Sequence, residues 1–263
     1  MAVNFSITMT GSPTRTRSGW LPPMAEAGSA LLDVLYPRCC LACDDPVDGN
    51  STYRFICTPC SRQLALIRDP CCGTCGYPFF GRMAENRACP HCVECQPRFG
   101  EGRAAVLMQG PGRRMVHGLK YRKETHVAED MRRVFLATGR FVPFVRDAVL
   151  IPVPLHPRKE RERGFNQSAL IAGILAGENG TASVRNLLVR VRDTETQTHL
   201  DRAQRRDNLK NAFAITPGCS LNPKSRYVLV DDVFTTGATL NACATVLRKA
   251  GASSLDVVTF GHG

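Results

Sequence analysis

The pattern of hydrophobic and polar positions changes near residue 100. Before it, apolar runs are short and broken by Gly, Pro and Cys; after Arg103, apolar segments of strand length alternate with stretches at helical spacing. Such alternation is typical of an α/β fold with a parallel sheet. The segments expected as strands or helices are Ala104–Met108, Met115–Leu136, Ala148–Val153, Ser168–Leu175, Leu187–Val191, Tyr227–Asp231, Leu240–Leu247 and Leu255–Phe260.

One of these segments predicts where a ligand would lie. Tyr227–Val230 is a continuous apolar run, as expected for a strand that is covered on both faces. Leu240–Leu247 keeps helical spacing, and Gly251 follows as a stop signal. Asp231–Thr239 is therefore expected to join the carboxyl end of a strand to the start of a helix. Open α/β sheets bind ligands at that edge.

Length and composition set the frame for this fold. A chain of 263 residues with 43% hydrophobic residues suits one or two globular domains. No apolar run reaches about 18 residues, so we predict no membrane span. Residues 1–23 lack the continuous apolar core of a secretory signal, which predicts a cytoplasmic protein. The expected organisation is a disordered leader (1–27), a cysteine-rich domain (28–100) and an α/β domain (101–263).

The cysteines form an internal repeat. Eleven of the 13 cysteines lie between Cys39 and Cys95, and the two copies are related by a constant offset, so that Cys40 corresponds to Cys72. Each copy is short and loop-rich and needs a covalent or metal cross-link to stay folded. Without an export signal, a reducing compartment favours metal over disulfides.

Each copy supplies two Cys-x2-Cys knuckles, which together complete a tetrahedral thiolate shell. We predict two structural zinc sites. Iron, disulfides and free core cysteines are the alternatives. Cys39 or Cys71 could replace its neighbour, Cys92 and Cys95 form a competing pair, and His91 is expected at the surface. The predicted ligands are Cys40, Cys43, Cys57 and Cys60 in the first site, and Cys72, Cys75, Cys89 and Cys92 in the second.

The segment Val228–Thr239 is suited to a ribose 5-phosphate group. Asp231 and Asp232 can accept hydrogen bonds from the ribose hydroxyls. The hydroxyl-rich loop Thr235–Thr239 follows, and Gly237 allows close backbone approach to a ligand. The N–H groups of this loop and of the next helix start favour a phosphate. The alternative is an ordinary strand–turn–helix with a threonine cap.

Three segments resemble the ComF family of competence-associated type I phosphoribosyltransferase-like proteins. Val228–Thr239 resembles the loop that binds phosphoribosyl pyrophosphate (PRPP), and Ile151–Gln167 looks like the region that holds pyrophosphate. Gln197–Phe213 is similar to the family's mobile-loop region, and the double zinc ribbon is found in longer members. The resemblance implies a Rossmann-like phosphoribosyltransferase domain behind a small double zinc ribbon, and a role in DNA uptake.

The resemblance also implies site residues and ligands. Asp231 and Asp232 would hold the ribose at the catalytic centre, and Mg²⁺ would bind together with PRPP. The family leaves the acceptor open, so the rival interpretation is a non-catalytic module that binds PRPP or single-stranded DNA for the DNA import machinery. The 5-phosphate would contact Thr235, Thr236, Gly237, Ala238 and Thr239, and pyrophosphate would contact Lys159, Arg161 and Arg163.

The cations of the second segment suit pyrophosphate on physical grounds as well. They surround a turn expected at Gly164, where Asn166 and Gln167 would add neutral donors at a helix start. Glu160 and Glu162 interleave with them, so a solvated loop is the alternative.

The formal charge of +11 suits phosphate-bearing partners, although a solvated basic surface is equally compatible with it. A local basic run with an aromatic residue, Tyr121, predicts weak binding of single-stranded DNA. The opposing interpretation is an amphipathic helix with Val116, Leu119 and the Lys120 stem packed inward. The basic residues of this run are Arg113, Arg114, Lys120, Arg122 and Lys123.

Overall fold

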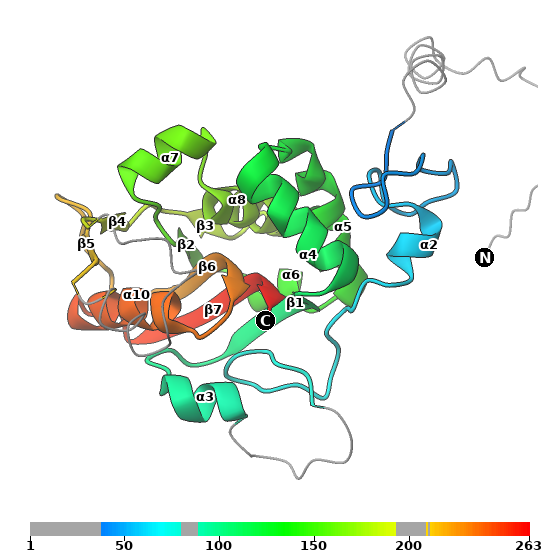
Figure 1. Cartoon of the computed structure of the whole chain (residues 1–263). Coiled ribbons are helices and arrows are strands. Elements are labelled where there is room, and N and C mark those ends of the chain that lie inside the picture. The colour runs from blue at the N-terminus through cyan, green and yellow to red at the C-terminus, as the bar shows by residue number, and fades with distance from the viewer. Residues whose placement is uncertain (1–37, 80–88, 193–208, 210) are drawn as a thin grey trace, which may run out of the picture. The chain divides into compact units, whose positions relative to one another are not determined.

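The computed structural model describes residues 38–79, 89–192, 209 and 211–263, which fall within one compact unit, Arg38–Gly263. Figure 1 shows its helices and strands. The predicted leader and most of the Gln197–Phe213 motif lie outside the described residues. Within the described part of the chain, no helix has both the length and the apolar character needed to cross a bilayer.

A five-stranded parallel sheet forms the centre of this unit, with strand order β1-β7-β6-β2-β3. The predicted parallel α/β architecture is therefore confirmed. The Leu187–Val191 segment instead joins a separate antiparallel pair, β4 with β5. The strands are β1 (Gly102–Leu107), β2 (Val149–Pro152), β3 (Ser183–Val184), β4 (Leu188–Arg190), β5 (Phe213–Ile215), β6 (Arg226–Phe234) and β7 (Ser254–His262).

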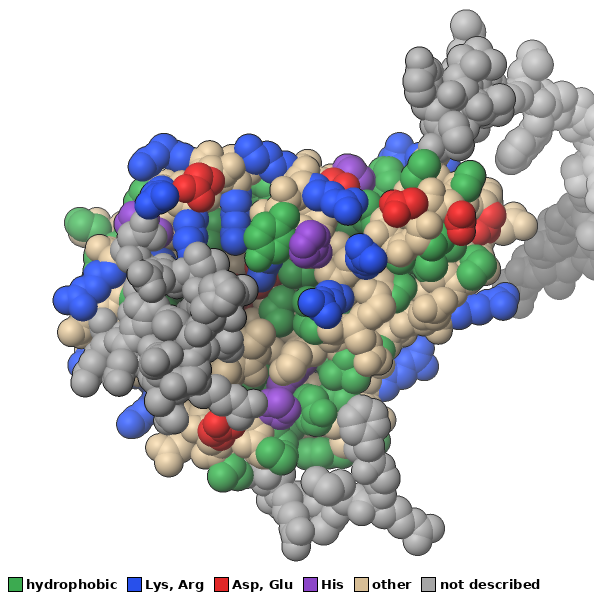
Figure 2. Space-filling view, viewed as in Figure 1, with side chains coloured by type: hydrophobic (Ala, Val, Ile, Leu, Met, Phe, Trp, Pro, Cys, Tyr) green, Lys and Arg blue, Asp and Glu red, His purple; other side chains and the backbone are tan. Residues whose placement is uncertain are grey.

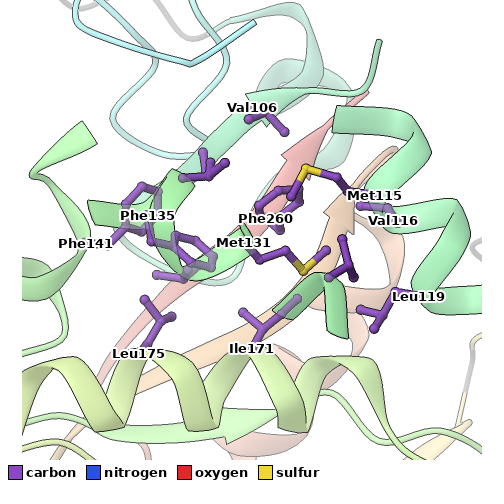
Figure 3. Packing of buried hydrophobic residues seen from close by; sticks show 14 of the residues in the cluster. Val106, Met115, Val116, Leu119, Met131, Phe135, Phe141, Ile171, Leu175 and Phe260 are labelled. Atoms are coloured by element: carbon purple, nitrogen blue, oxygen red, sulfur yellow. The ribbon is translucent and has the colours of Figure 1, made fainter. Parts of the chain in front are cut away.

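Helices cover both faces of the sheet, as the apolar run in β6 predicts. Val228 and Val230 point into a cluster formed with α4, α5 and α8, part of which Figure 3 shows. Tyr227 and Leu229 point into a second cluster with α10. All four side chains are buried, because alternate residues of a strand face opposite sides. The helices are α2 (Thr58–Ser61), α3 (Pro90–Cys95), α4 (Gly110–His117), α5 (Ala128–Thr138), α6 (Phe141–Phe144), α7 (Pro157–Arg163), α8 (Gln167–Asn179) and α10 (Ala238–Lys249).

The prediction of one helical stretch over Met115–Leu136 is wrong. After α4 the chain makes a π-type turn, η1 (Gly118–Arg122), and a 3-10 turn, η2 (Thr125–Val127), before α5 begins. Lys123 ends η1 with a left-handed backbone (φ 56°), which an α-helix does not accommodate. This break places η1 close to the carboxyl end of β6.

The two cysteine repeats lie against opposite faces of the sheet. Ribbon 1 (Cys39–Cys60) packs Tyr53 and Ile56 into the cluster with α4 and α5. Ribbon 2 (Cys71–Cys95, as far as described) packs its buried cysteines into the cluster with α10. The segment between them runs along the sheet edge, where Ile67 N donates to Ala105 O of β1 (2.8 Å). The connecting segment thus leads from one face to the other.

Candidate functional site

Each ribbon brings four predicted cysteines together. Within each group, the sulfur atoms all lie within 4.8 Å of one another. Sulfur pairs are 3.7 Å apart at Cys43–Cys57 and at Cys72–Cys92, and 3.3 Å apart at Cys75–Cys89. A tetrahedral shell with Zn–S bonds of about 2.3 Å needs sulfur atoms about 3.8 Å apart. Both groups therefore have the dimensions of a zinc site.

The two ribbons share their local geometry. Cys39 pairs with Pro46 in an isolated antiparallel bridge, and Cys71 pairs with Pro78 in the same way. In each copy a short helix with Pro in its first turn follows a cysteine at the N-cap. The repeat seen in the sequence is therefore a repeat of structure.

Backbone donors support the thiolate form of one ligand. Burial opposes ionisation of Cys40, but Cys57 N and Ala42 N each donate to its Sγ (3.4 Å). Together with hydrogen bonding to Cys43, these contacts lower the pKa of Cys40 to about 7. A thiolate is the form that binds metal.

The three ambiguous cysteines lie outside both groups. Cys39 is exposed. Cys71 Sγ accepts from Arg140 Nη2 (3.0 Å), and Arg140 also pairs with Asp69 (3.3 Å). Cys95 is buried beside Gly237 in the phosphate loop, a position that knuckle spacing could not reveal.

The predicted phosphate loop, Thr235–Thr239, connects β6 with α10. β6 continues three residues beyond Asp231, to Phe234, before the turn. Gly237 is the N-cap of α10 and has a left-handed backbone (φ 71°), a conformation that glycine adopts readily. The first N–H groups of a helix lack intrahelical partners and favour an anion. The expected order of strand, loop and helix is therefore present, although the strand ends at Phe234 rather than at Asp231.

The two predicted carboxylates lie at this strand end and have different partners. Asp231 Oδ1 accepts from Ser168 Oγ at the start of α8 (2.9 Å) and from Asp232 N (2.9 Å). Asp232 pairs with Lys120 Nζ from η1 (2.9 Å). Burial, and then the neighbouring Asp232 carboxylate, raise the pKa of Asp231, while Lys120 and Ser168 oppose the rise. The result is a polar site that draws residues from β6, α8 and η1, and the acid site is the name used below for Asp231, Asp232, Ser168 and Lys120.

Lys120 and Ser168 are site residues that the sequence analysis missed. Lys120 was assigned to a DNA-binding run or to core packing, and its ion pair with Asp232 places it in the acid site instead. Ser168 was treated as part of a helix alone. Neither partner is close in sequence, so no local spacing could have indicated these contacts.

The predicted pyrophosphate cations lie on α7, which ends at Gly164 with a left-handed backbone. Arg163 contacts Tyr121 of η1, with the guanidinium carbon 5.9 Å from the ring centre, and so lies beside the acid site. Lys159 and Arg161 lie on the same short helix. Figure 2 shows basic side chains gathered over α7 and α4 on the viewed face.

Asn166 and Gln167, the two residues expected to donate to pyrophosphate, lie at the start of α8. Asn166 caps α8, since its Oδ1 accepts from Ser168 N (2.9 Å) and Ala169 N (3.3 Å). Gln167 is buried, and its Oε1 accepts from Arg163 Nη1 (3.0 Å). Asn166 Nδ2 donates to Val153 O (3.0 Å), so its donor is engaged within the protein. Gln167 Nε2 is buried and has no hydrogen-bond partner among the described residues, so a donor role for Gln167 stays a prediction.

The basic run is divided between core and surface. Val116 and Leu119 are buried, as the amphipathic interpretation predicted. Tyr121 is 62% exposed and lies beside His117, with ring centres 4.7 Å apart. The exposed basic residues are Arg113, Arg114, Arg122 and Lys123.

A cavity of about 590 Å³ lies between ribbon 2, α10 and β5, next to the phosphate loop. Thr236 and Ala238 line it, together with Cys95, Asn241 and Phe213. The phosphate loop and this cavity therefore share a wall with ribbon 2.

Comparisons with known proteins match the ribbons to a domain family and most of the chain to curated relatives. Residues 31–93 match the double zinc ribbon domain family. The DNA utilization protein YhgH of Salmonella typhimurium is 32% identical over 230 residues, which cover 84% of this chain and 95% of the relative. Competence protein F of Haemophilus influenzae is 29% identical (78% of this chain, 96% of the relative), and competence protein ComFC of Bacillus subtilis is 26% identical (89% and 97%).

Proposed function

Because this chain belongs to the ComF family of competence proteins, we propose that it binds PRPP together with Mg²⁺ and acts in DNA uptake. The relatives' names supply the biological context, and the site supplies the ligand class. We place this activity in the cytoplasm, because eight metal-binding cysteines need a reducing compartment.

The observation that carries the proposal is the junction of β6 and α10. Two adjacent carboxylates precede a glycine-containing loop, and the loop leads into a helix N-terminus. Asp231 and Asp232 are suited to the 2′- and 3′-hydroxyls of a ribose. The backbone of Thr235–Thr239 is suited to a 5-phosphate. Lys159, Arg161 and Arg163 of α7 are proposed for the pyrophosphate end, and Lys120, paired with Asp232, adds positive charge beside the carboxylates.

The corresponding chemistry would be substitution at C1 of the ribose. A nucleophile would form a bond to C1 as the bond from C1 to the pyrophosphate oxygen breaks, and the electron pair would leave with pyrophosphate. This chain would supply positioning and charge stabilisation rather than a covalent nucleophile. Mg²⁺ would neutralise charge on the pyrophosphate when bound.

Calorimetry with PRPP and Mg²⁺ tests the binding step. We expect Asp232→Ala combined with Thr236→Ala to weaken binding more than tenfold, because each lost hydrogen bond to a charged group costs about 1.5–3 kcal/mol. Lys224→Ala is the matched surface control, since Lys224 is exposed and precedes β6, at the end of the strand away from the loop. Equal affinity of wild type and double variant would refute the assignment.

Pyrophosphate release from PRPP, measured across a panel of amine and nucleobase acceptors, separates transfer from binding alone. Release that depends on one acceptor class would identify an enzyme. Binding without release for every acceptor would favour the non-catalytic module.

Single-stranded DNA is a second candidate ligand. The exposed ring of Tyr121, which lies near Arg163 and His117, provides a stacking platform beside basic residues. This surface lies next to the acid site through Lys120, so nucleic acid and a phosphoribosyl ligand could be bound side by side.

A further inference from the structure

The phosphate loop rests directly on ribbon 2. At Gly237 the backbone leaves no room for a side chain, since a Cβ there would lie 2.7 Å from Cys95 Sγ and 2.6 Å from Phe234 Cζ. Cys95 is the last residue of α3, which begins at the metal-ligand pair of ribbon 2. The loop and the metal site are therefore separated by one short helix.

Asn241 fixes this contact from the side of α10. Its Nδ2 donates to Cys95 O (3.1 Å) and Gln96 O (3.3 Å), and its Oδ1 accepts from Arg98 N (2.7 Å). Both amide protons and the carbonyl of Asn241 are thus engaged with the end of ribbon 2. Asn241 lies one turn into the helix whose N-terminus forms the phosphate site.

A group of aromatic rings makes a second connection. Phe234, the residue before the loop, stacks on His262 with ring centres 4.6 Å apart. His262 in turn contacts Tyr77 (5.0 Å) and His91 (4.9 Å) of ribbon 2. His91 lies between the ligands Cys89 and Cys92, so this stack also leads from the metal site to the loop.

Ribbon 1 is attached elsewhere. The buried carboxylate of Asp130 on α5 accepts from Arg54 N (2.6 Å) and Phe55 N (2.7 Å) of that ribbon. Phe55 packs on His126 of η2, with ring centres 4.2 Å apart. Among the described residues, these anchors connect ribbon 1 to η2 and α5, whereas those of ribbon 2 connect to the phosphate loop.

We propose that ribbon 2, through Asn241, positions the phosphate loop, so that phosphate affinity depends on the metal in ribbon 2 and not on the metal in ribbon 1. The proposal rests on the function proposed above. A phosphate is bound well only when the loop N–H groups are held in place before binding. Loss of the ribbon 2 metal would release α3, Cys95 and the rings, and the loop would lose its support.

Asn241→Leu and Asp130→Leu form a matched pair, because each replaces one polar anchor of one ribbon by an apolar side chain of similar size. Calorimetry would use ribose 5-phosphate and PRPP with Mg²⁺, after metal analysis has established that both variants keep two zinc ions per chain. We expect Asn241→Leu to weaken binding of both ligands about tenfold, and Asp130→Leu to change it less than twofold. Equal effects of the two variants would overturn the proposal.

Amide hydrogen exchange of the ligand-free protein provides a readout that a general loss of stability would not reproduce. Exchange over Thr235–Thr239 should increase in Asn241→Leu and in the smaller change Asn241→Ala, and stay at the wild-type rate in Asp130→Leu. Unchanged exchange in both Asn241 variants would refute the positioning role. If the wild-type protein bound neither phosphate ligand, the proposed function would fail, and the exchange result would still decide whether Asn241 positions the loop.

Discussion

The two ribbons are copies of one motif that contact different parts of the same molecule. Each has four cysteines whose sulfur atoms lie within 4.8 Å of one another, and the same short bridge between a cysteine and a proline. Ribbon 1 is anchored to α5 through Asp130, and ribbon 2 lies under the phosphate loop through Cys95 and Asn241. The contribution of a metal site is therefore set by what the ribbon packs against, which the ligand motif itself does not encode.

Removal of one metal at a time should have the largest effect. We expect Cys57→Ser with Cys60→Ser, or Cys89→Ser with Cys92→Ser, to lower the zinc content from about two to one per chain. Both should destabilise the chain strongly, since structural zinc contributes apparent free energies of about 10–16 kcal/mol in small domains. Metal analysis, thermal melting and PRPP calorimetry of the two variants test this.

The comparison predicts different ligand binding by these two variants. The ribbon 1 variant should bind PRPP within a factor of two of wild type below its melting temperature, and the ribbon 2 variant should bind it at least tenfold more weakly. A folded ribbon 1 variant that lost PRPP affinity to the same extent would overturn the proposal that ribbon 2 alone positions the loop.

A methyl group at the contact between ribbon 2 and the loop should have the next largest effect. Gly237→Ala meets both a left-handed backbone and two close neighbours, whereas Gly180→Ala, at the same φ of 71°, meets no atom within 4 Å. Backbone strain alone costs about 1–2 kcal/mol. Denaturant unfolding should show a larger loss at Gly237, accompanied by a loss of phosphate binding. Similar losses at both glycines would mean that the contact with Cys95 and Phe234 adds nothing.

The pH dependence of Asp231 should give a smaller effect on PRPP affinity. Asp231 and Asp232 contact Ser168 and Lys120 from the face of the sheet that ribbon 1 covers. Burial and the Asp232 carboxylate raise the pKa of Asp231 to about 7. Below that pH Asp231 is neutral and a poorer acceptor for ribose hydroxyls, so PRPP affinity should fall as the pH decreases through about 7. Calorimetry across this range, with Asp231→Asn as the control, measures the change.

The folding stability should depend on pH in the opposite direction to the PRPP affinity. A carboxyl with a raised pKa binds its proton more tightly in the folded chain, so its contribution to folding is lost as the pH rises toward about 7. Asp231→Asn should therefore raise the melting temperature more at pH 8 than at pH 5. A uniform increase at both values would mean that Asp231 titrates normally. In the calorimetry, the 5-phosphate of the ligand also titrates near pH 6, so the pH dependence of PRPP affinity that comes from this phosphate should persist in Asp231→Asn.

Local signals in the sequence account for the predictions that the structure confirms. The apolar run before Asp231, the helical spacing after Thr239 and the cysteine repeat each depend on neighbouring residues. Lys120 was misassigned because its partner, Asp232, is distant in the chain. The break at Lys123 depends on one left-handed residue that is not a glycine. The location of each ribbon depends on the path of the chain along β1, which no motif specifies.

The smallest expected effect concerns the surface beside ribbon 1, where weak binding of single-stranded DNA is proposed. Arg113, Arg114 and Lys123 are exposed near Tyr121, and their reversal to Glu leaves the buried Val116 and Leu119 in place. Each phosphate contact that is lost should reduce the slope of log affinity against log salt by about 0.7. Tyr121→Ala should remove a stacking contribution of about 1–3 kcal/mol with little change in that slope, because the ring is uncharged. Fluorescence anisotropy with a labelled oligonucleotide at several salt concentrations separates the two terms. If the triple variant binds DNA as wild type does, the basic run is a solvated surface, and any role in DNA uptake must act through a partner protein.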